Sequence, residues 1–125
     1  MNGWKHSDLW KRDGKNFSVE IKRWGQLDRN VWNVYAYIKR GHALFDSLAG
    51  QEGKVSWGID IGFDLHCGIN YAKFYRNEKG EIYCVQVGDD WAHYGDEYYE
   101  SCTDFDGAFG VVAEANALFE YLEAL

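Results

Sequence analysis

A sustained run of apolar residues at helical spacing lies at the C-terminal end of this chain, and it limits the folds that the chain can adopt. Val111, Ala115, Leu118, Leu122 and Leu125 recur at intervals of three or four residues, as in an amphipathic helix. Upstream, apolar and polar residues alternate, as in strands with one buried face. Strands followed by a helix, without regular alternation of the two, indicate an α+β fold rather than a parallel βαβ fold.

Acidic residues are expected at defined places around this helix. Asp104 or Asp106 precedes it and can cap its first turn, where a negative charge also complements the helix dipole. Glu114, Glu120 and Glu123 are predicted to face away from the apolar stripe. We therefore expect one face of the helix to bury itself against a sheet and the other to meet water.

Two antiparallel hairpins are expected before the helix. Residues 16–23 alternate strictly and residues 31–38 are β-branched and aromatic, with turn chemistry over residues 24–30. Residues 65–75 and 81–87 predict a second hairpin around a glycine-containing turn. The expected architecture is an antiparallel sheet of about four to five strands packed against the C-terminal helix.

The remaining segments carry weaker patterns. Residues 41–48 predict a short helical turn, and residues 55–63 alternate but contain two glycines that weaken a strand. Residues 88–103 have no clean period and predict an irregular loop. The length of 125 residues fits one domain, so we expect residues 1–125 to form a single domain.

The cysteines and the absence of long apolar runs indicate a compartment. No stretch reaches the roughly 18 apolar residues of a membrane span, and residues 1–14 lack the apolar core of a signal peptide. Cys67, Cys84 and Cys102 are odd in number and too widely spaced for a structural zinc motif. We therefore expect buried, inert, reduced thiols in a protein of the cytosol.

Charge is divided unevenly along the chain. Residues 1–40 contain nine Lys/Arg and four Asp/Glu, whereas residues 81–125 contain eleven Asp/Glu and no Lys or Arg, within a net charge of −7. Such an acidic surface repels nucleic acid, which is bound through cationic side chains. It attracts a basic surface on another protein, although a solvated acidic face that only aids solubility is the plain alternative.

The acidic part of the chain is also rich in aromatic residues. Flat aromatic rings bury large areas at low entropic cost and the acids select basic partners, so this segment is predicted to bind a protein. Packing of Trp91, Tyr94 and Tyr98 under the last helix is the structural alternative. No catalytic residue, metal ligand or cofactor is assigned; the predicted binding residues are Asp89, Asp90, Trp91, His93, Tyr94, Asp96, Glu97 and Tyr98.

A thiol enzyme is one alternative that the residues leave open. A cysteine nucleophile needs a nearby histidine base and an orienting group. Cys67 with His93 and one of Asp89, Asp90 or Asp96 could supply that set. The spacing matches no local signature of a cysteine enzyme, so only the fold can bring these side chains together.

A metal-dependent hydrolase is a second alternative. His42, His66 and His93 with Asp90 or Asp96 offer imidazole and carboxylate ligands that suit several divalent metals. The chain contains no compact pair such as H-E-x-x-H, so the convergence of these histidines is again a matter for the fold.

Three segments resemble a group of small proteins of bacteriophages and prophages. They are residues 35–45, residues 65–71 and residues 87–96, and the resemblance extends over residues 31–100. In that group the first segment resembles His-Pro-Leu-Phe, the second His-Gly-Gly before an aromatic residue, and the third Gly-x-Asp-Tyr-x-His-x-Gly-Asp. The chain departs from these patterns at Ala43, Cys67 and Trp91.

The resemblance implies a context and no catalytic residues. Small acidic phage accessory proteins resemble counter-defence factors, such as anti-CRISPR proteins, which block a bacterial immune protein in the host cytosol. The leading hypothesis is therefore a non-enzymatic inhibitor that binds a basic, nucleic-acid-handling surface of such a protein.

Two other functions and an assembly remain open in the sequence. One alternative is a sponge for a nucleotide immune signal, held between the aromatics and cations of the N-terminal half; the other is a metal-dependent hydrolase using His66 and His93. A homodimer through the helix or an edge strand is compatible with the sequence. The cations available to the sponge are Lys22, Arg23, Arg29, Lys39, Arg40, Lys73 and Arg76.

Overall fold

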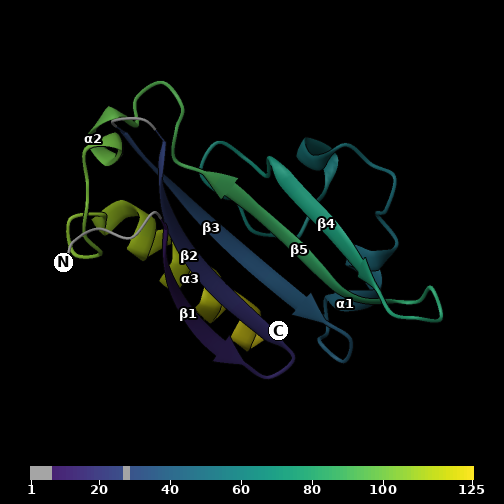
Figure 1. The fold of residues 1–125 in the computed structure, drawn as a ribbon. Helices are drawn as coiled ribbons and strands as arrows, with labels where there is room; N and C mark the ends of the chain where they lie inside the picture. The colour runs from purple at the N-terminus through teal and green to yellow at the C-terminus, as the bar shows by residue number, and fades with distance from the viewer. Residues whose placement is uncertain (1–6, 27–28) are drawn as a thin grey trace.

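The centre of the molecule is an antiparallel sheet. The computed structural model describes residues 7–26 and 29–125, in which five strands lie in the order β1-β2-β3-β5-β4 (Figure 1). β3 is central and pairs with β2, its neighbour in sequence, and with β5, which follows about fifty residues later. The strands are β1 Ser7–Gly14, β2 Phe17–Gln26, β3 Arg29–Lys39, β4 Tyr71–Arg76 and β5 Ile82–Asp90.

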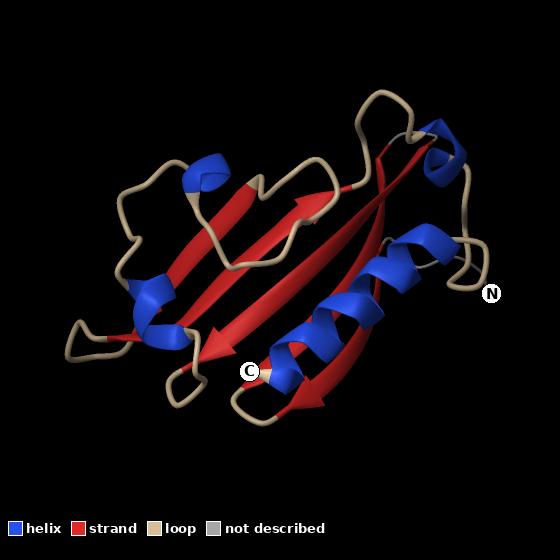
Figure 2. Cartoon of the chain, turned by 180° about the vertical axis from the view of Figure 1, so that it is seen from behind, coloured by secondary structure: helices blue, strands red, loops and turns tan. Residues whose placement is uncertain are grey.

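One long helix, α3 Phe109–Ala124, crosses one face of the sheet (Figure 2). The short helices α1 Phe45–Ala49 and α2 Glu97–Glu100 and a 3₁₀ turn at Ser56–Gly58 belong to the connections. Within the described residues, none of the helices combines the length and the apolar character that crossing a bilayer requires.

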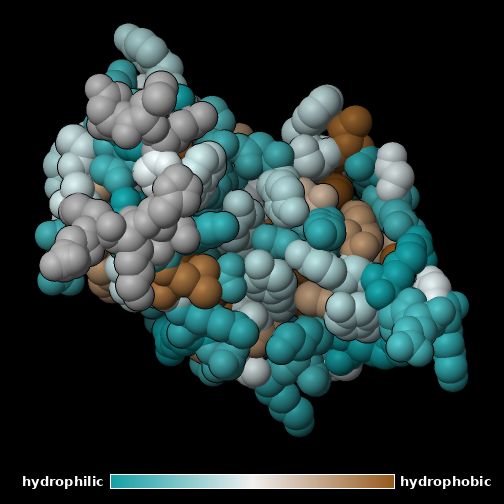
Figure 3. All heavy atoms as spheres, in the orientation of Figure 1, coloured by the Kyte–Doolittle hydropathy of each residue, from teal (hydrophilic) through white to brown (hydrophobic). Residues whose placement is uncertain are grey.

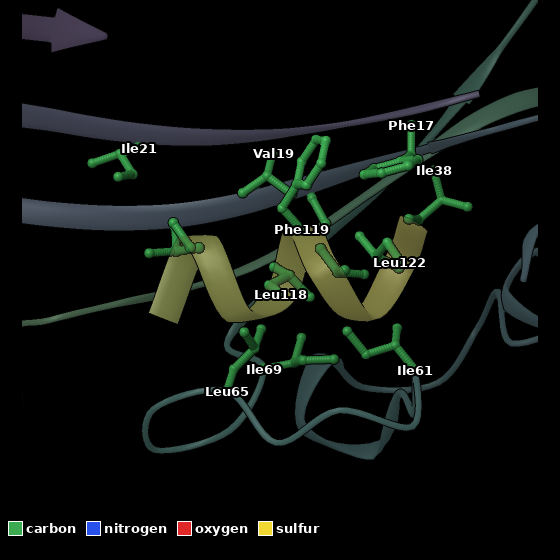
Figure 4. Close-up of a cluster of buried hydrophobic side chains, with 14 of the residues drawn as sticks. Phe17, Val19, Ile21, Ile38, Ile61, Leu65, Ile69, Leu118, Phe119 and Leu122 are labelled. Atoms are coloured by element: carbon green, nitrogen blue, oxygen red, sulfur yellow. The ribbon is translucent and has the colours of Figure 1, made fainter. Parts of the chain in front are cut away.

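The apolar residues of β2, β3 and β5 point to the face that α3 covers. Figure 4 shows side chains of the sheet on one side of the helix and of the connection between α1 and β4 on the other. Leu118 and Leu122 lie between these two layers and are almost fully buried. The long connection lies on the same face of the sheet as α3, beside the helix and over β4 and β5, and it continues the core there (Figure 2); its contributors are Ile59, Ile61, Leu65 and Ile69.

Among the described residues, no helix covers the opposite face of the sheet (Figure 1), and the surface seen from this side is mostly hydrophilic or intermediate in hydropathy (Figure 3). The Tyr37 hydroxyl donates a hydrogen bond to Glu20 at 3.1 Å, and the Tyr75 hydroxyl donates one to Gln86 at 2.7 Å. These hydrogen bonds tie two half-buried tyrosine rings to neighbouring strands, so part of the aromatic content is half-buried sheet packing rather than core.

The α+β class, the antiparallel sheet and the C-terminal helix confirm the predictions made from periodicity, and α1 Phe45–Ala49 confirms a short helix near residues 41–48. The first hairpin is longer than predicted, because Gly25 pairs with Asn30 across the expected turn. Residues 27–28 of that turn lie outside the described residues. β5 also continues through Asp90, into the predicted loop.

Two strand predictions were incomplete. β1 was not predicted, because its sequence SDLWKRDG is rich in charged residues; it is tolerated there because an edge strand pairs on one side only. Residues 65–70 were predicted as strand but form a turn and loop before β4. Cys67 and Gly68 have φ angles of 57° and 83°, which a regular strand does not contain, and the Gly68 N–H closes the turn on the Leu65 carbonyl at 2.8 Å.

The surroundings of α3 also differ from expectation. Neither Asp104 nor Asp106 caps the helix, whose N-cap position is Ala108 without a side-chain hydrogen bond. Asp104 instead accepts a hydrogen bond from the Gly107 N–H at 2.6 Å and closes the turn before the helix. Glu114 does not face away from the core. It accepts hydrogen bonds from two segments that pack on α3, as described next.

Candidate functional site

Histidine, cysteine and carboxylate side chains converge where β5 ends. The Nε2 atom of His66 lies 2.8 and 2.9 Å from the two carboxylate oxygens of Asp96. The His66 ring stacks on Trp91, with ring centroids 3.8 Å apart, and lies edge-on to His93 at 6.1 Å. One ligand atom from each of His66, Cys67 and His93 lies within 4.8 Å of the others. We call His66, Cys67, His93 and Asp96 the imidazole–carboxylate cluster.

Two loops bring the cluster together. The turn at residues 65–68 presents His66 and Cys67, and the loop after β5 presents His93 and Asp96. Within that second loop, the His93 N–H donates to the Asp96 carboxylate at 2.9 Å, while the Asp96 N–H donates to the His93 carbonyl at 2.9 Å. Asp96 is buried and accepts from both loops, so its carboxylate fixes one relative to the other.

Glu114 of α3 joins this cluster to the helix. Its carboxylate accepts hydrogen bonds from the His66 N–H and, at 3.1 Å, from the Trp91 indole N–H. Three parts of the chain far apart in sequence therefore meet at one acid. Glu114 lies three residues after Val111 and four before Leu118, a spacing at the border of the apolar stripe that could have identified it from the sequence.

Asp89 supports the cluster from inside the sheet. Its side chain is fully buried, and neither carboxylate oxygen meets a hydrogen-bond donor among the described residues. Burial, and then the negative charge of Glu114 beside it, raise the pKa of Asp89 to about 10. This direction favours the protonated, uncharged form of the side chain inside the sheet.

Cys67 is exposed, which corrects the prediction that all three cysteines are buried; Cys84 and Cys102 are buried as predicted, and all three are free thiols. Desolvation and the nearby carboxylates, Asp96 foremost, raise the pKa of the Cys67 thiol. A nucleophilic cysteine needs the opposite shift, so the electrostatics do not favour the thiol-enzyme hypothesis.

The predicted metal set assembles in part. His66, His93, Asp90 and Asp96 lie together, and the His93 Nδ1 atom is 3.4 Å from an Asp90 oxygen. His42 lies elsewhere. Its Nε2 atom is 2.8 Å from the Leu122 carbonyl oxygen, and its ring edge packs on Phe17 in the core.

The predicted binding residues divide between interior and surface. Asp89, Trp91 and Asp96 are buried and cannot contact a partner, while Asp90 and His93 are partly exposed. Tyr94, Glu97 and Tyr98 are exposed. The surface that an incoming protein would meet is therefore displaced toward α2 and the start of α3, and it adds residues that were not predicted, namely Asp104, Asp106 and Phe109.

We call Glu97, Tyr98, Asp104, Asp106 and Phe109 the acidic–aromatic face. Tyr98 and Phe109 are 52% and 63% exposed, yet their rings pack against each other, with ring centroids 5.6 Å apart. The Tyr98 hydroxyl donates to the Gly107 carbonyl at 2.9 Å, which fixes its ring. Beside this pair, a hollow of about 240 Å³ is lined by Phe105, Asp106, Phe109, Val112, Ala113 and Asn116.

The cations proposed for the nucleotide sponge do not gather at this face. Arg29 contacts Glu100 at 3.6 Å, but Arg23 is buried against Asp8, and Arg76 pairs with Glu52 near α1.

Comparison with known proteins adds no assignment, since no family model, curated protein or solved structure matches the chain.

Proposed function

We propose that this protein is a non-enzymatic binding protein of the counter-defence type, which docks its acidic–aromatic face on a basic, nucleic-acid-handling surface of a bacterial immune protein. The observation that carries the proposal is an exposed, contacting aromatic pair, Tyr98 and Phe109, set among acids in a segment without Lys or Arg. The resemblance to phage accessory proteins supplies the biological context.

The geometry of the hollow beside this pair supports a basic partner. Phe105, Phe109 and Val112 offer apolar walls and Asp106 a carboxylate at the same place. A lysine or arginine side chain combines an apolar stem with a cationic head, so it fits both features at once. The Tyr98 ring is held by its hydrogen bond to Gly107, so little conformational entropy is lost when it is covered.

The test compares two variants with the same change in charge. Glu97→Gln with Asp106→Asn neutralises two acids of the face, and Asp46→Asn with Glu78→Gln neutralises two exposed acids near α1 and the β4–β5 turn, at the other end of the sheet (Figure 1). The four proteins to compare are the wild type, each double variant, and Tyr98→Ala with Phe109→Ala.

The readouts are phage plating on bacteria that carry nucleic-acid-targeting immune systems, and affinity of the purified protein for the immune protein that it inhibits. We expect the wild type and the control variant to restore plaques. Neutralising the two acids of the face should weaken binding about tenfold or more and reduce its salt dependence. Removing the two rings should weaken the free energy of binding by more than about 2 kcal/mol. Equal activity of face and control variants, or no restored plaques on any system of the panel, contradicts the proposal.

A further inference from the structure

The imidazole–carboxylate cluster has the composition of a transition-metal site. Its histidine and cysteine side chains distinguish it from the acidic–aromatic face. Two imidazoles and a thiol present ligand atoms within 4.8 Å of one another. Asp96 adds a carboxylate whose oxygens are 2.8 and 2.9 Å from His66 Nε2 and, for Oδ2, 3.7 Å from His93 Nδ1. With zinc–ligand distances of about 2.0–2.3 Å, ligand atoms of a tetrahedral site lie about 3.3–3.8 Å apart. Binding therefore needs the ligand atoms of His66, Cys67 and His93 to approach one another by up to about an ångström, and the His66–Asp96 distance to lengthen by about half an ångström.

His93 provides a second and independent observation. Its Nδ1 atom is buried and makes no hydrogen bond among the described residues. The nearest groups to it are carboxylate oxygens of Asp90 and Asp96, at 3.4 and 3.7 Å. A buried polar atom without a partner costs free energy, and a cation between this nitrogen and the acids would satisfy all three groups.

The backbone at Cys67 is a third observation. Its φ angle of 57° is left-handed, a conformation that strains a non-glycine residue, and Gly68 follows at 83°. Glycine would be the unstrained residue at position 67. The strained turn presents an exposed thiol beside His66, whose ring is held by Trp91 and Asp96.

The charge around the cluster also favours a cation. Asp90, Asp96 and Glu114 surround it. Among residues 7–26 and 29–125, no ion pair brings a lysine or arginine to these carboxylates. A bound divalent ion would neutralise this local excess of negative charge.

We propose that His66, Cys67 and His93, with the carboxylate of Asp96, bind one Zn²⁺ ion per chain. The soft thiolate together with imidazole favours zinc over magnesium or calcium, which prefer oxygen ligands. Zinc displaces the proton of the Cys67 thiol, which passes to solvent as the sulfur–zinc bond forms, and a zinc bond to His66 Nε2 requires the proton on that atom to move to Nδ1. This inference does not depend on the proposed function.

Binding is measured on the full chain after removal of metal by a chelator. Zn²⁺ is titrated calorimetrically, and Co²⁺ serves as a spectroscopic substitute whose charge-transfer absorption reports a thiolate ligand and whose visible bands report tetrahedral geometry. The variants are Cys67→Gly, which relieves the backbone, and His93→Gln; Cys84→Ser is the matched control, since Cys84 is a buried thiol on β5.

We expect one ion per chain for the wild type and for Cys84→Ser, with the charge-transfer band in both. Cys67→Gly should keep or raise the stability of the metal-free protein, lose the charge-transfer band and lower the affinity for zinc by more than about tenfold, and His93→Gln should lower the affinity similarly. Absence of binding at micromolar zinc overturns the proposal. So does a charge-transfer band that survives in Cys67→Gly or disappears in Cys84→Ser.

Discussion

Asp89 shows how one side chain can hold a proton inside a sheet. It occupies a position on β5 whose neighbours Val85 and Val87 are core residues, and it is as fully buried as they are. Burial disfavours the charged form of a carboxyl group, so the pKa of Asp89 is raised. The side chain lies beside Glu114, which accepts hydrogen bonds from the His66 N–H and the Trp91 indole N–H.

Because the pKa of Asp89 is raised, its contribution to the stability of the fold decreases as the pH rises. The pKa of Asp89 rises from 3.8 to about 10 on folding, so the folded chain binds the proton more tightly than the unfolded chain. The contribution of Asp89 to the free energy of unfolding is therefore fully present below pH 3.8. It is lost as the pH rises from 3.8 to about 10, at up to about 1.4 kcal/mol per pH unit.

Asp89→Asn should remove that dependence, because the amide has a similar shape and does not ionise. The free energy of unfolding in urea is measured at pH 6 and pH 8.5. We expect the stability of the variant relative to the wild type to increase as the pH rises. Asp64→Asn, at an exposed acid, is the control and should follow the wild type. If the free energy of unfolding of Asp89→Asn differs from that of the wild type by the same amount at both pH values, Asp89 does not carry the proton.

The residue scale is also where sequence reasoning succeeded least. The pairing of His66 with Asp96 spans thirty residues and depends on how two loops fold, which no local pattern encodes. Asp89 and Asp96 are charged residues of a polar-looking segment, so burial was not expected of them. Glu114 alone had a readable signal, its spacing from Val111 and Leu118.

At the scale of the element, β5 depends on a glycine in its middle. Gly88 pairs with Tyr35 on β3 and Tyr71 on β4, and these two rings contact each other at 5.6 Å. A Cβ atom at Gly88 would lie 2.4 Å from the Val34 carbonyl oxygen and 2.4 Å from the Tyr35 ring. The backbone oxygen cannot move aside without breaking the ladder between β3 and β5.

Gly88→Ala should therefore destabilise the protein by about 2 kcal/mol or more, measured as the free energy of unfolding in urea. Gly25→Ala on β2 is the matched control, because nothing lies within 4 Å of its added Cβ atom. That change should stay within about 0.5 kcal/mol of the wild type. A smaller effect at position 88 than at position 25 would mean that the sheet is not as tightly paired as described.

Elements were predictable where periodicity was strong and one-sided. β2 and β3 alternate or are β-branched, and α3 carries a clear stripe, so their existence and type followed from the residues. β1 did not, since its pairing with β2 is made by backbone groups that any residue but proline offers. Residues 65–70 were apolar enough for a strand, but the left-handed turn at Cys67 is set by packing on Glu114 and Trp91.

At the scale of the whole molecule, α3 is the layer on which the other parts depend. Leu118 is fully buried between the sheet and the connection that carries Ile61, Leu65 and Ile69 (Figure 4). The same helix supplies Glu114 to the cluster and Phe109 to the acidic–aromatic face. Both proposed sites therefore rely on the seating of one helix.

Leu118→Ala should cost about 2–5 kcal/mol of unfolding free energy, the range for a buried leucine. Leu125→Ala is the control, because Leu125 is 51% exposed, and it should change stability by less than about 0.5 kcal/mol. Hydrogen exchange is the second measurement: amides of residues 59–69 should lose protection in Leu118→Ala before those of β2. Equal losses in both variants would contradict the packing described here.

The strand order also has a consequence for synthesis on the ribosome. β1, β2 and β3 are neighbours in sequence and can pair as they emerge, but the free edge of β3 waits for β5, which is made about fifty residues later. During that interval the nascent sheet presents an unpaired, largely apolar strand, the kind of edge to which chaperones and other chains attach. Translation rate across residues 40–90 should therefore influence the yield of native protein.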